Sequence, residues 1–190
     1  FFDPVTQEKL DRRAQLETDL HYACEGGQLH LHFQPQVDPS GKVVGAEALL
    51  RWRHPRLGWI SPTEFIPIAE DTGAIVIVGR WVLDNCCRQL KAWERRAATR
   101  HLALAMNVSA REFQSNGFID SVHSILKCTG VNPSLLVVEL TESMLLQDMA
   151  DSIGKMKALK RLGLQIALDD FGTGYSSLAH LKRLPVDQLK

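Results

Sequence analysis

Three nearly all-apolar runs, each followed by a helical pattern, constrain the fold of this chain more than any other feature. The runs cover residues 102–108, 135–140 and 164–168, and the helical patterns lie near 116–128, 148–162 and 176–183. Strands that are apolar on both faces are typical of parallel sheets covered on both sides, and a helix connects each such strand to the next. The pattern therefore predicts an α/β fold around a parallel sheet.

The beginning of the chain predicts an antiparallel arrangement instead. An amphipathic helix is expected over residues 8–25, two strands over 29–33 and 43–52, and a turn between the strands at 38–42. Two strands joined by a short polar turn form a hairpin. We interpret His30 and His32 as sheet surface, and Trp52 and Trp59 as packing residues.

Two helices are expected after the hairpin. Ser61-Pro62-Thr63-Glu64 has the pattern of a helix start, with a serine cap, a proline at the first helical position and a glutamate three residues after the serine. A longer helix is expected over residues 74–96, with an apolar stripe of Val78, Val82, Cys86 and Leu90.

Composition excludes several classes of protein. Lysine plus arginine and aspartate plus glutamate both number 22, so no bulk attraction to nucleic acid or to a membrane surface is expected. No apolar run approaches the roughly 20 residues of a membrane span. The cysteines lack metal-binding spacing, and we expect buried, reduced thiols and a cytoplasmic location; they are Cys24, Cys86, Cys87 and Cys128.

Oxygen-bearing side chains interrupt or end four of the expected strands. They are Glu47, Asn107, Glu139 and the adjacent pair Asp169 and Asp170. Parallel strands align their carboxyl ends, so we expect at least the last three sites to meet at one rim. Carboxylates with one amide suit Mg²⁺, Mn²⁺ or Ca²⁺, whereas any one of these residues alone would more often be a cap or a hydrogen-bonded core residue.

Two basic residues have two interpretations each. Arg51 lies four residues after Glu47 on the same strand face, where it could meet a phosphate or form a surface ion pair. Lys190 ends a short strand-like run and is either a site residue or a solvated lysine.

Six segments resemble, in order, the motifs of EAL domains, the bacterial cyclic-di-GMP phosphodiesterases. They are residues 33–36 (Phe-Gln-Pro-Gln), 47–52 (Glu-Ala-Leu-Leu-Arg-Trp), 107–109 (Asn-Val-Ser), 139–142 (Glu-Leu-Thr-Glu), 169–177 and 184–190. The resemblance covers the chain from about residue 10 to residue 190. It implies a TIM-like (β/α)8 barrel whose first strand is antiparallel, in agreement with the expected hairpin.

The resemblance implies metal-binding and catalytic roles for the residues that match these motifs. Glu47, Asn107, Glu139 and Asp169 are implied as ligands of a first metal ion, with Asp169 and Asp170 binding a second. Glu47, Asp169 and Asp170 thereby become catalytic residues. Lys190 would orient the attacking water or offset charge on the phosphate.

Further roles concern the substrate and a loop. Gln34 and Arg51 are implied to contact the dinucleotide, and Leu49 to line its pocket. Glu142 would anchor the loop 171–177, which in this family links the active site to a dimer interface.

The implied reaction is two-metal hydrolysis of cyclic di-GMP to linear pGpG. The implied cofactors are Mg²⁺ or Mn²⁺, two ions in the complete domain, and Ca²⁺ is expected to inhibit. The implied partners are cyclic di-GMP, a second copy through the loop 171–177, and an upstream sensor or GGDEF-type domain. A place in the cytoplasmic part of a larger, membrane-anchored protein is the alternative to a cytoplasmic protein. No DNA partner is expected.

The chain departs from the family pattern at its C-terminal end. A complete barrel has eight strands and typically ~250 residues, and about six strands are expected here. We therefore expect residues 1–25 to be a connector helix and residues 26–190 to be an EAL domain without about its last two βα units. Slow or absent turnover by this chain alone is expected, and the alternatives are an impaired cyclic-di-GMP-binding or regulatory module and an interaction scaffold.

Overall fold

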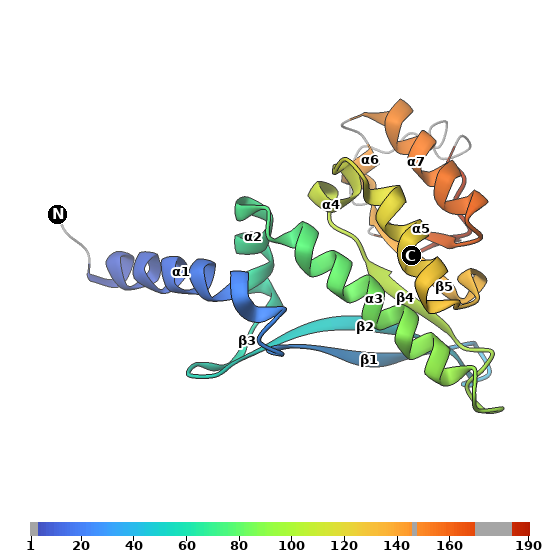
Figure 1. Cartoon of the computed structure of the whole chain (residues 1–190), viewed down its shortest axis with the longest axis horizontal. Helices are drawn as coiled ribbons and strands as arrows, with labels where there is room; N and C mark the ends of the chain where they lie inside the picture. The colour runs from blue at the N-terminus through green and yellow to red at the C-terminus, as the bar shows by residue number, and fades with distance from the viewer. Residues whose placement is uncertain (1–3, 146–147, 170–183) are drawn as a thin grey trace.

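The sheet is built from strands far apart in the sequence, and helices cover it (Figure 1). The computed structural model describes residues 4–145, 148–169 and 184–190. Its strands are β1 (Leu29–Val37), β2 (Val43–His54), β3 (Gly58–Ile60), β4 (Ala103–Asn107), β5 (Leu136–Thr141), β6 (Gln165–Asp169) and β7 (Gln188–Leu189). Its helices are α1 (Pro4–Ala23), α2 (Pro62–Thr72), α3 (Ile75–Trp93), α4 (Ala110–Gln114), α5 (Phe118–Thr129), α6 (Glu142–Leu145) and α7 (Met149–Arg161), with a 3-10 turn at Pro133–Leu135.

Strand order follows the predicted change from antiparallel to parallel pairing. The order is β1-β2-β4-β5-β6-β7, and the short strand β3 pairs with the end of β2. β1 and β2 are antiparallel, which confirms the predicted hairpin, whereas β2, β4, β5, β6 and β7 are parallel. The strands that the structure describes form an open sheet with β1 and β7 at its edges.

The two faces of the sheet differ in what covers them. A large apolar core lies between the sheet and the helices, and the α3 stripe of Val78, Val82, Cys86 and Leu90 is buried in it as predicted. Figure 1 shows α3, α5 and α7 side by side along the sheet. The opposite face carries only a small buried cluster of Ala105, Val137 and Ala167. The strand residues of this second face are therefore available for a site.

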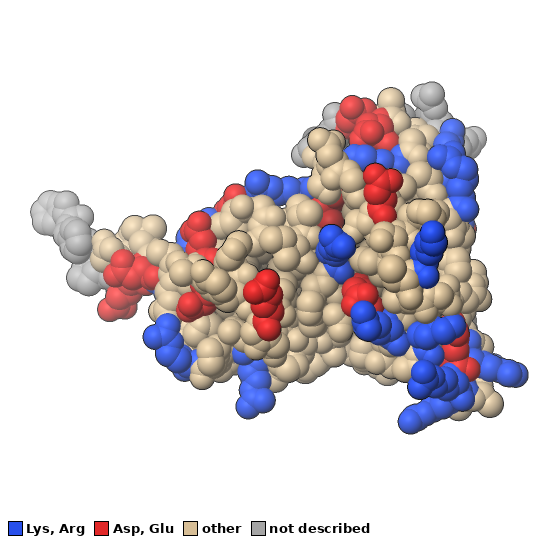
Figure 2. Space-filling view, in the orientation of Figure 1, with Lys and Arg blue, Asp and Glu red and all other residues tan. Residues whose placement is uncertain are grey.

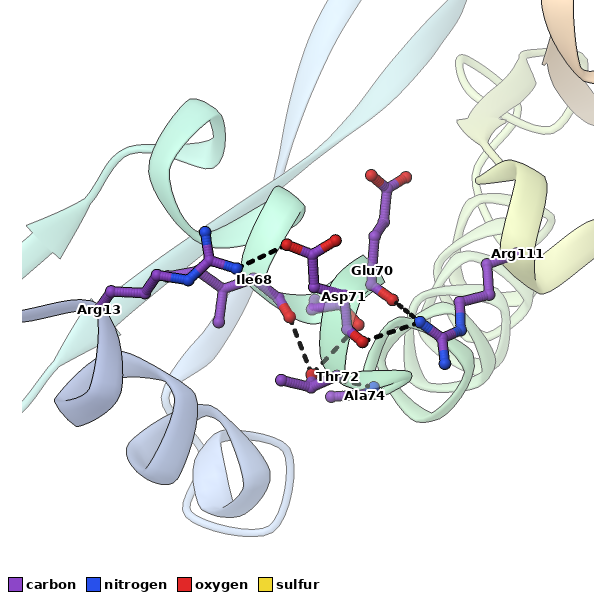
Figure 3. A network of polar contacts seen from close by, with 8 residues as sticks. Arg13, Ile68, Glu70, Asp71, Thr72, Ala74 and Arg111 are labelled. Carbon is purple, nitrogen blue, oxygen red and sulfur yellow. Dashed lines mark hydrogen bonds and ion pairs between the residues drawn. The ribbon is translucent and has the colours of Figure 1, made fainter. Parts of the chain in front are cut away.

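Helix α2 joins α1 to α4 through its C-terminal end (Figure 3). Arg13 of α1 forms a 2.6 Å ion pair with Asp71, and Arg111 of α4 donates to the carbonyls of Glu70 and Asp71. Gly73 ends α2 with a φ of +84°, and the guanidinium of Arg111 fills the space that a side chain there would need. The last carbonyls of α2 thus receive donors from a helix that directly follows β4.

The capping contacts predicted at the start of α2 do not form. Pro62 does occupy the first turn, but the side chain of Ser61 makes no capping hydrogen bond and contacts Thr63 instead. Glu64 forms an ion pair with Arg12, 52 residues away. A distant arginine therefore binds the carboxylate that the local pattern assigned to the cap.

A capping box forms at the start of α4 instead, and the buried carboxyl of Glu112 is one of its two acceptors. The hydroxyl of Ser109 accepts from the N–H of Glu112, and the Glu112 carboxyl accepts from the N–H of Ser109. Glu112 is only 4% exposed, and burial raises its pKa to about 8. Its carboxyl lies against Gly79 of α3, where a Cβ would come within 2.2 Å of it. Gly79 therefore leaves the space in which the carboxyl of Glu112 is buried.

We expect Gly79→Ala to lower the free energy of unfolding by about 1–3 kcal/mol, although alanine is the better helix former. The new methyl group would displace the Glu112 carboxyl from its buried position. Urea unfolding of the wild type, Gly79→Ala, Glu112→Ala and the double variant measures the coupling between the two sites. If Gly79→Ala is as destabilising with Glu112→Ala as without it, the proposed clash is wrong.

The charged residues on the surface reflect the equal numbers of basic and acidic residues in the sequence. Figure 2 shows both signs on the face in view, with Lys and Arg gathering at the lower right near the end of α3. The prediction that all four cysteines are buried is wrong. Cys86 and Cys87 are buried, but Cys24 is partly buried and Cys128 is exposed near the end of α5. No helix within the described residues is long and apolar enough to cross a membrane.

Candidate functional site

The four oxygen-bearing residues predicted on different strands lie on one face of the sheet. Asn107 is paired in register with Glu139, and Glu139 is paired with Ala167, two residues before Asp169. Glu47 is paired with Ala105, two residues before Asn107. Residues two apart on a strand share a face. Parallel pairing therefore brings these side chains to adjacent levels, two residues apart, of the face that the helices leave uncovered.

Direct contacts connect Glu47, Asn107 and Glu139, two of them through Lys190. Asn107 donates from Nδ2 to Glu47 Oε1 at 2.8 Å. Lys190, which follows β7, donates from Nζ to Glu139 Oε1, and the same Nζ lies 3.9 Å from Glu47 Oε2. The ammonium of Lys190 therefore lies between two carboxylates that come from β2 and β5.

Glu139 is in the least exposed position of the cluster. Its side chain is fully buried, whereas the side chains of Glu47 and Lys190 are 25% and 29% exposed. Burial raises the pKa of Glu139, the ammonium of Lys190 opposes this, and the negative charges of Glu47 and Asp169 raise it further. The site thus concentrates negative charge that a cation would stabilise.

The donor set fits a divalent cation that prefers oxygen ligands. Glu139 Oε2 is buried and has no hydrogen-bond partner among the described residues. Carboxylate and amide oxygens are ligands of Mg²⁺, Mn²⁺ and Ca²⁺. No three His, Cys, Asp or Glu side chains in residues 4–145, 148–169 and 184–190 are grouped closely enough to hold a metal. The contact of Lys190 with Glu139 would have to open for these oxygens to converge on an ion.

The predicted substrate residues lie on β1 and β2. Gln34 is directly opposite Glu47, and Leu49 is two residues further along the same face. Arg51 lies on this face too, and its Nη1 donates to the carbonyl of Leu50 at 2.8 Å. The structure thus places Gln34 beside Glu47 on the neighbouring strand, and Leu49 and Arg51 further along β2 on the same face.

The remaining predicted site residues belong to the loop after β6 and to its anchor. Glu142 begins α6 and is buried. Asp170, the loop 171–177 and the expected helix 176–183 lie outside the described residues. Their predicted roles in a second metal site and in dimerisation stay predictions.

Trp59 was interpreted from the sequence as a packing residue, and that interpretation is wrong. Trp52 is fully buried, but Trp59 is 56% exposed. Trp59 lies on β3, opposite Arg53 of β2, and its ring contacts the rings of His30 and His32. A three-residue strand leaves too short a pattern to be recognised from sequence, so the face on which Trp59 lies could not be predicted.

Comparisons with known proteins identify relatives over the whole chain. The EAL domain family matches residues 17–190. A bifunctional diguanylate cyclase/cyclic di-GMP phosphodiesterase of Pseudomonas aeruginosa, MucR, is 44% identical over 191 residues, which are all of this chain and 28% of that protein. The cyclic di-GMP phosphodiesterase PdeR of Escherichia coli is 37% identical over 189 residues, again all of this chain and 28% of that protein. The chain thus spans between a quarter and a third of the length of these curated relatives.

A solved structure agrees with the fold and with the family. The structure of the PaMucR phosphodiesterase in complex with cyclic di-GMP superposes with a TM-score of 0.88 at 46% identity, covering 92% of this chain and 71% of that chain. The predicted TIM-like α/β class with an antiparallel first strand is confirmed, and the described strands form an open part of such a barrel. Phosphodiesterases of this family depend on divalent metal ions.

Proposed function

This chain belongs to the EAL domain family, and from that membership we propose that it is the catalytic region of a cyclic di-GMP phosphodiesterase. One observation carries the proposal: Glu47, Asn107 and Glu139, with Asp169 nearby, share the uncovered face of the sheet, and a buried oxygen of Glu139 has no partner among the described residues. Relatives named as cyclic di-GMP phosphodiesterases support the choice of substrate.

The proposed reaction adds one water across one phosphodiester of the ring. The bond from phosphorus to the ribose 3′ oxygen breaks, and linear pGpG with a 5′ phosphate is the product. Two divalent ions, Mg²⁺ or Mn²⁺, would activate the water and stabilise charge on the phosphate when bound. Glu47, Asn107, Glu139 and Asp169 would hold the first ion, and Asp169 with Asp170 the second.

The chain's own residues would position the substrate and balance its charge. Lys190 is the cation nearest to Glu47 and Glu139 in the described site, and its ammonium could turn from Glu139 to a phosphate oxygen or to the attacking water. Gln34, opposite Glu47, and Arg51, further along β2, would bind the dinucleotide beside Leu49. Their shared face makes one continuous surface from the acidic cluster to the end of β2.

A binding module without turnover is the second candidate. The ion pair between Lys190 and Glu139 already neutralises the most buried carboxylate, as a site that only binds a dinucleotide could do. In either case we propose a cytoplasmic domain that acts beside further signalling domains. A sensor or GGDEF-type domain upstream and a homodimer through the loop 171–177 belong to this proposal.

Turnover and binding separate the candidates. We expect the protein to convert cyclic di-GMP to pGpG only slowly in Mg²⁺ or Mn²⁺, as chromatography of the product measures. Ca²⁺ and chelation should inhibit this turnover. Calorimetry in Ca²⁺ then measures binding without turnover. Binding without product in any of the metals would replace the enzyme by the binding module, and neither binding nor product would leave an interaction scaffold.

A further inference from the structure

An exposed tryptophan extends the face that carries the acidic cluster. Trp59 is 56% exposed and pairs in register with Arg53, and Arg53 lies on the same face of β2 as Glu47, Leu49 and Arg51. The opposite face of this part of β2 is closed, because Trp52 there is fully buried in the core under the helices. Trp59 therefore faces the side on which a ligand of the cluster would lie.

Neighbouring rings hold the indole in one orientation. The ring centroids of His30 and His32 each lie 5.6 Å from that of Trp59, with interplanar angles of 64° and 69°. The guanidinium carbon of Arg53 lies 6.0 Å from the indole centroid. Such edge-to-face and cation–π contacts are favourable and directional. A lone exposed apolar side chain is ordinary on a protein surface, but one held by three partners is pre-oriented.

Strand register places this ring within reach of a nucleotide bound at the cluster. His32 is opposite Leu49 and His30 is opposite Arg51, two and four residues beyond Glu47. At the rise of a strand these levels lie about 7 and 13 Å from Glu47. The indole contacts both histidines, so it extends back from Arg53 towards the cluster. A nucleotide whose phosphate lies at Glu47 would carry its base to this level.

We propose that Trp59, oriented by His30 and His32, is a stacking platform for one guanine base of the bound dinucleotide. This inference rests on the proposed function and adds to it a determinant of substrate affinity. An indole stacks on the π-face of any base, and an arginine can donate to guanine O6 and N7 together. Arg53, beside the indole, supplies such a donor and would favour guanine over other bases.

The test compares Trp59→Ala with a matched exposed aromatic, Tyr22→Ala on α1, in the intact protein. Tyr22 is 62% exposed, so both changes remove an accessible ring. Base–aromatic stacking predicts that Trp59→Ala raises KM for cyclic di-GMP, and its Kd in Ca²⁺, by roughly 5- to 100-fold. The Kd for Mn²⁺ without nucleotide should be unchanged, because no aromatic ring of a ligand is bound in that measurement. Trp59→Phe should recover most of the affinity, and Tyr22→Ala should match the wild type in every assay.

Three results would overturn the inference, and they differ from failure of the proposed function. Unchanged KM and Kd in Trp59→Ala, with an active wild type, would leave the phosphodiesterase and remove the platform. An equal loss of Mn²⁺ affinity without nucleotide would show that Trp59 acts through the fold. Loss of affinity that Trp59→Phe does not recover would exclude stacking. A wild type that neither binds nor hydrolyses cyclic di-GMP would instead contradict the proposed function itself.

Discussion

Glu139→Gln is expected to lower the turnover of cyclic di-GMP about 1,000-fold, the largest effect on activity that the site predicts. Glu139 is the fully buried carboxylate of the cluster, and its Oε2 has no partner among the described residues. Glutamine keeps the shape but loses the negative charge and one of the two oxygens that a divalent ion could use. Single-turnover assays in Mg²⁺ and calorimetric titration with Mn²⁺ measure activity and metal binding.

Stability separates a lost metal ligand from a damaged fold. Burial raises the pKa of Glu139, so its ionised form destabilises the folded state above that pKa, and glutamine has no such penalty. We therefore expect Glu139→Gln without metal to melt no lower than the wild type, although its contact with Lys190 weakens. The increase in melting temperature on adding Mn²⁺ should disappear. Glu25→Gln, an exposed position, is the control. A variant that keeps its metal-dependent increase and more than a tenth of its turnover would contradict the assignment.

Glu112→Gln is expected to stabilise the protein by several kcal/mol at alkaline pH and to have little effect near pH 4. Burial raises the pKa of Glu112 from the ordinary 4.5 to about 8. As pH rises from 4.5 to 8 the unfolded chain releases this proton first, so the folded state loses stability throughout that interval. The total loss is about 5 kcal/mol, since each pH unit between the two values contributes about 1.4 kcal/mol. Glutamine does not ionise and keeps an acceptor for the N–H of Ser109.

Urea unfolding of both proteins at pH 4.5, 6, 7.5 and 9 measures this difference directly. The difference in unfolding free energy between Glu112→Gln and the wild type should grow with pH up to about 8 and then level off. Taking the difference removes every other group that titrates in both proteins. Parallel pH curves for the two proteins would show that Glu112 titrates normally, as an exposed carboxylate does.

Two segments with the same capping pattern form different contacts, which the sequence alone does not predict. Ser61 and Glu64 have the spacing of a capping box, but Arg12 binds Glu64 from a helix 52 residues earlier. Ser109 and Glu112 have the same spacing, and there the box forms. The local preference is equal in the two places. Which partner a carboxylate takes depends on which helix packs beside it, and that is a tertiary property.

For the candidate site too, the sequence identified the polar residues but not their partners. Polar residues inside or at the ends of apolar runs identified Glu47, Asn107, Glu139 and Asp169, because burying an oxygen without a partner is unfavourable and marks an unusual position. That Lys190 would contact Glu139 could not be read from a run of five residues at the end of the chain. Trp59 was assigned to packing because β3 is only three residues long and has no periodicity of its own.

By itself the sequence determined the alternation of strands and helices, the antiparallel opening and the identity of the acidic residues, since hydrophobic periodicity and turn residues act over a few neighbours along the chain. Only the tertiary structure decided which face of each strand remained uncovered, which cation lies between the carboxylates, and that Trp59 lies exposed against His30 and His32 rather than in the core. Those outcomes depend on strand register and on helices that pack from distant segments, and no local pattern specifies either.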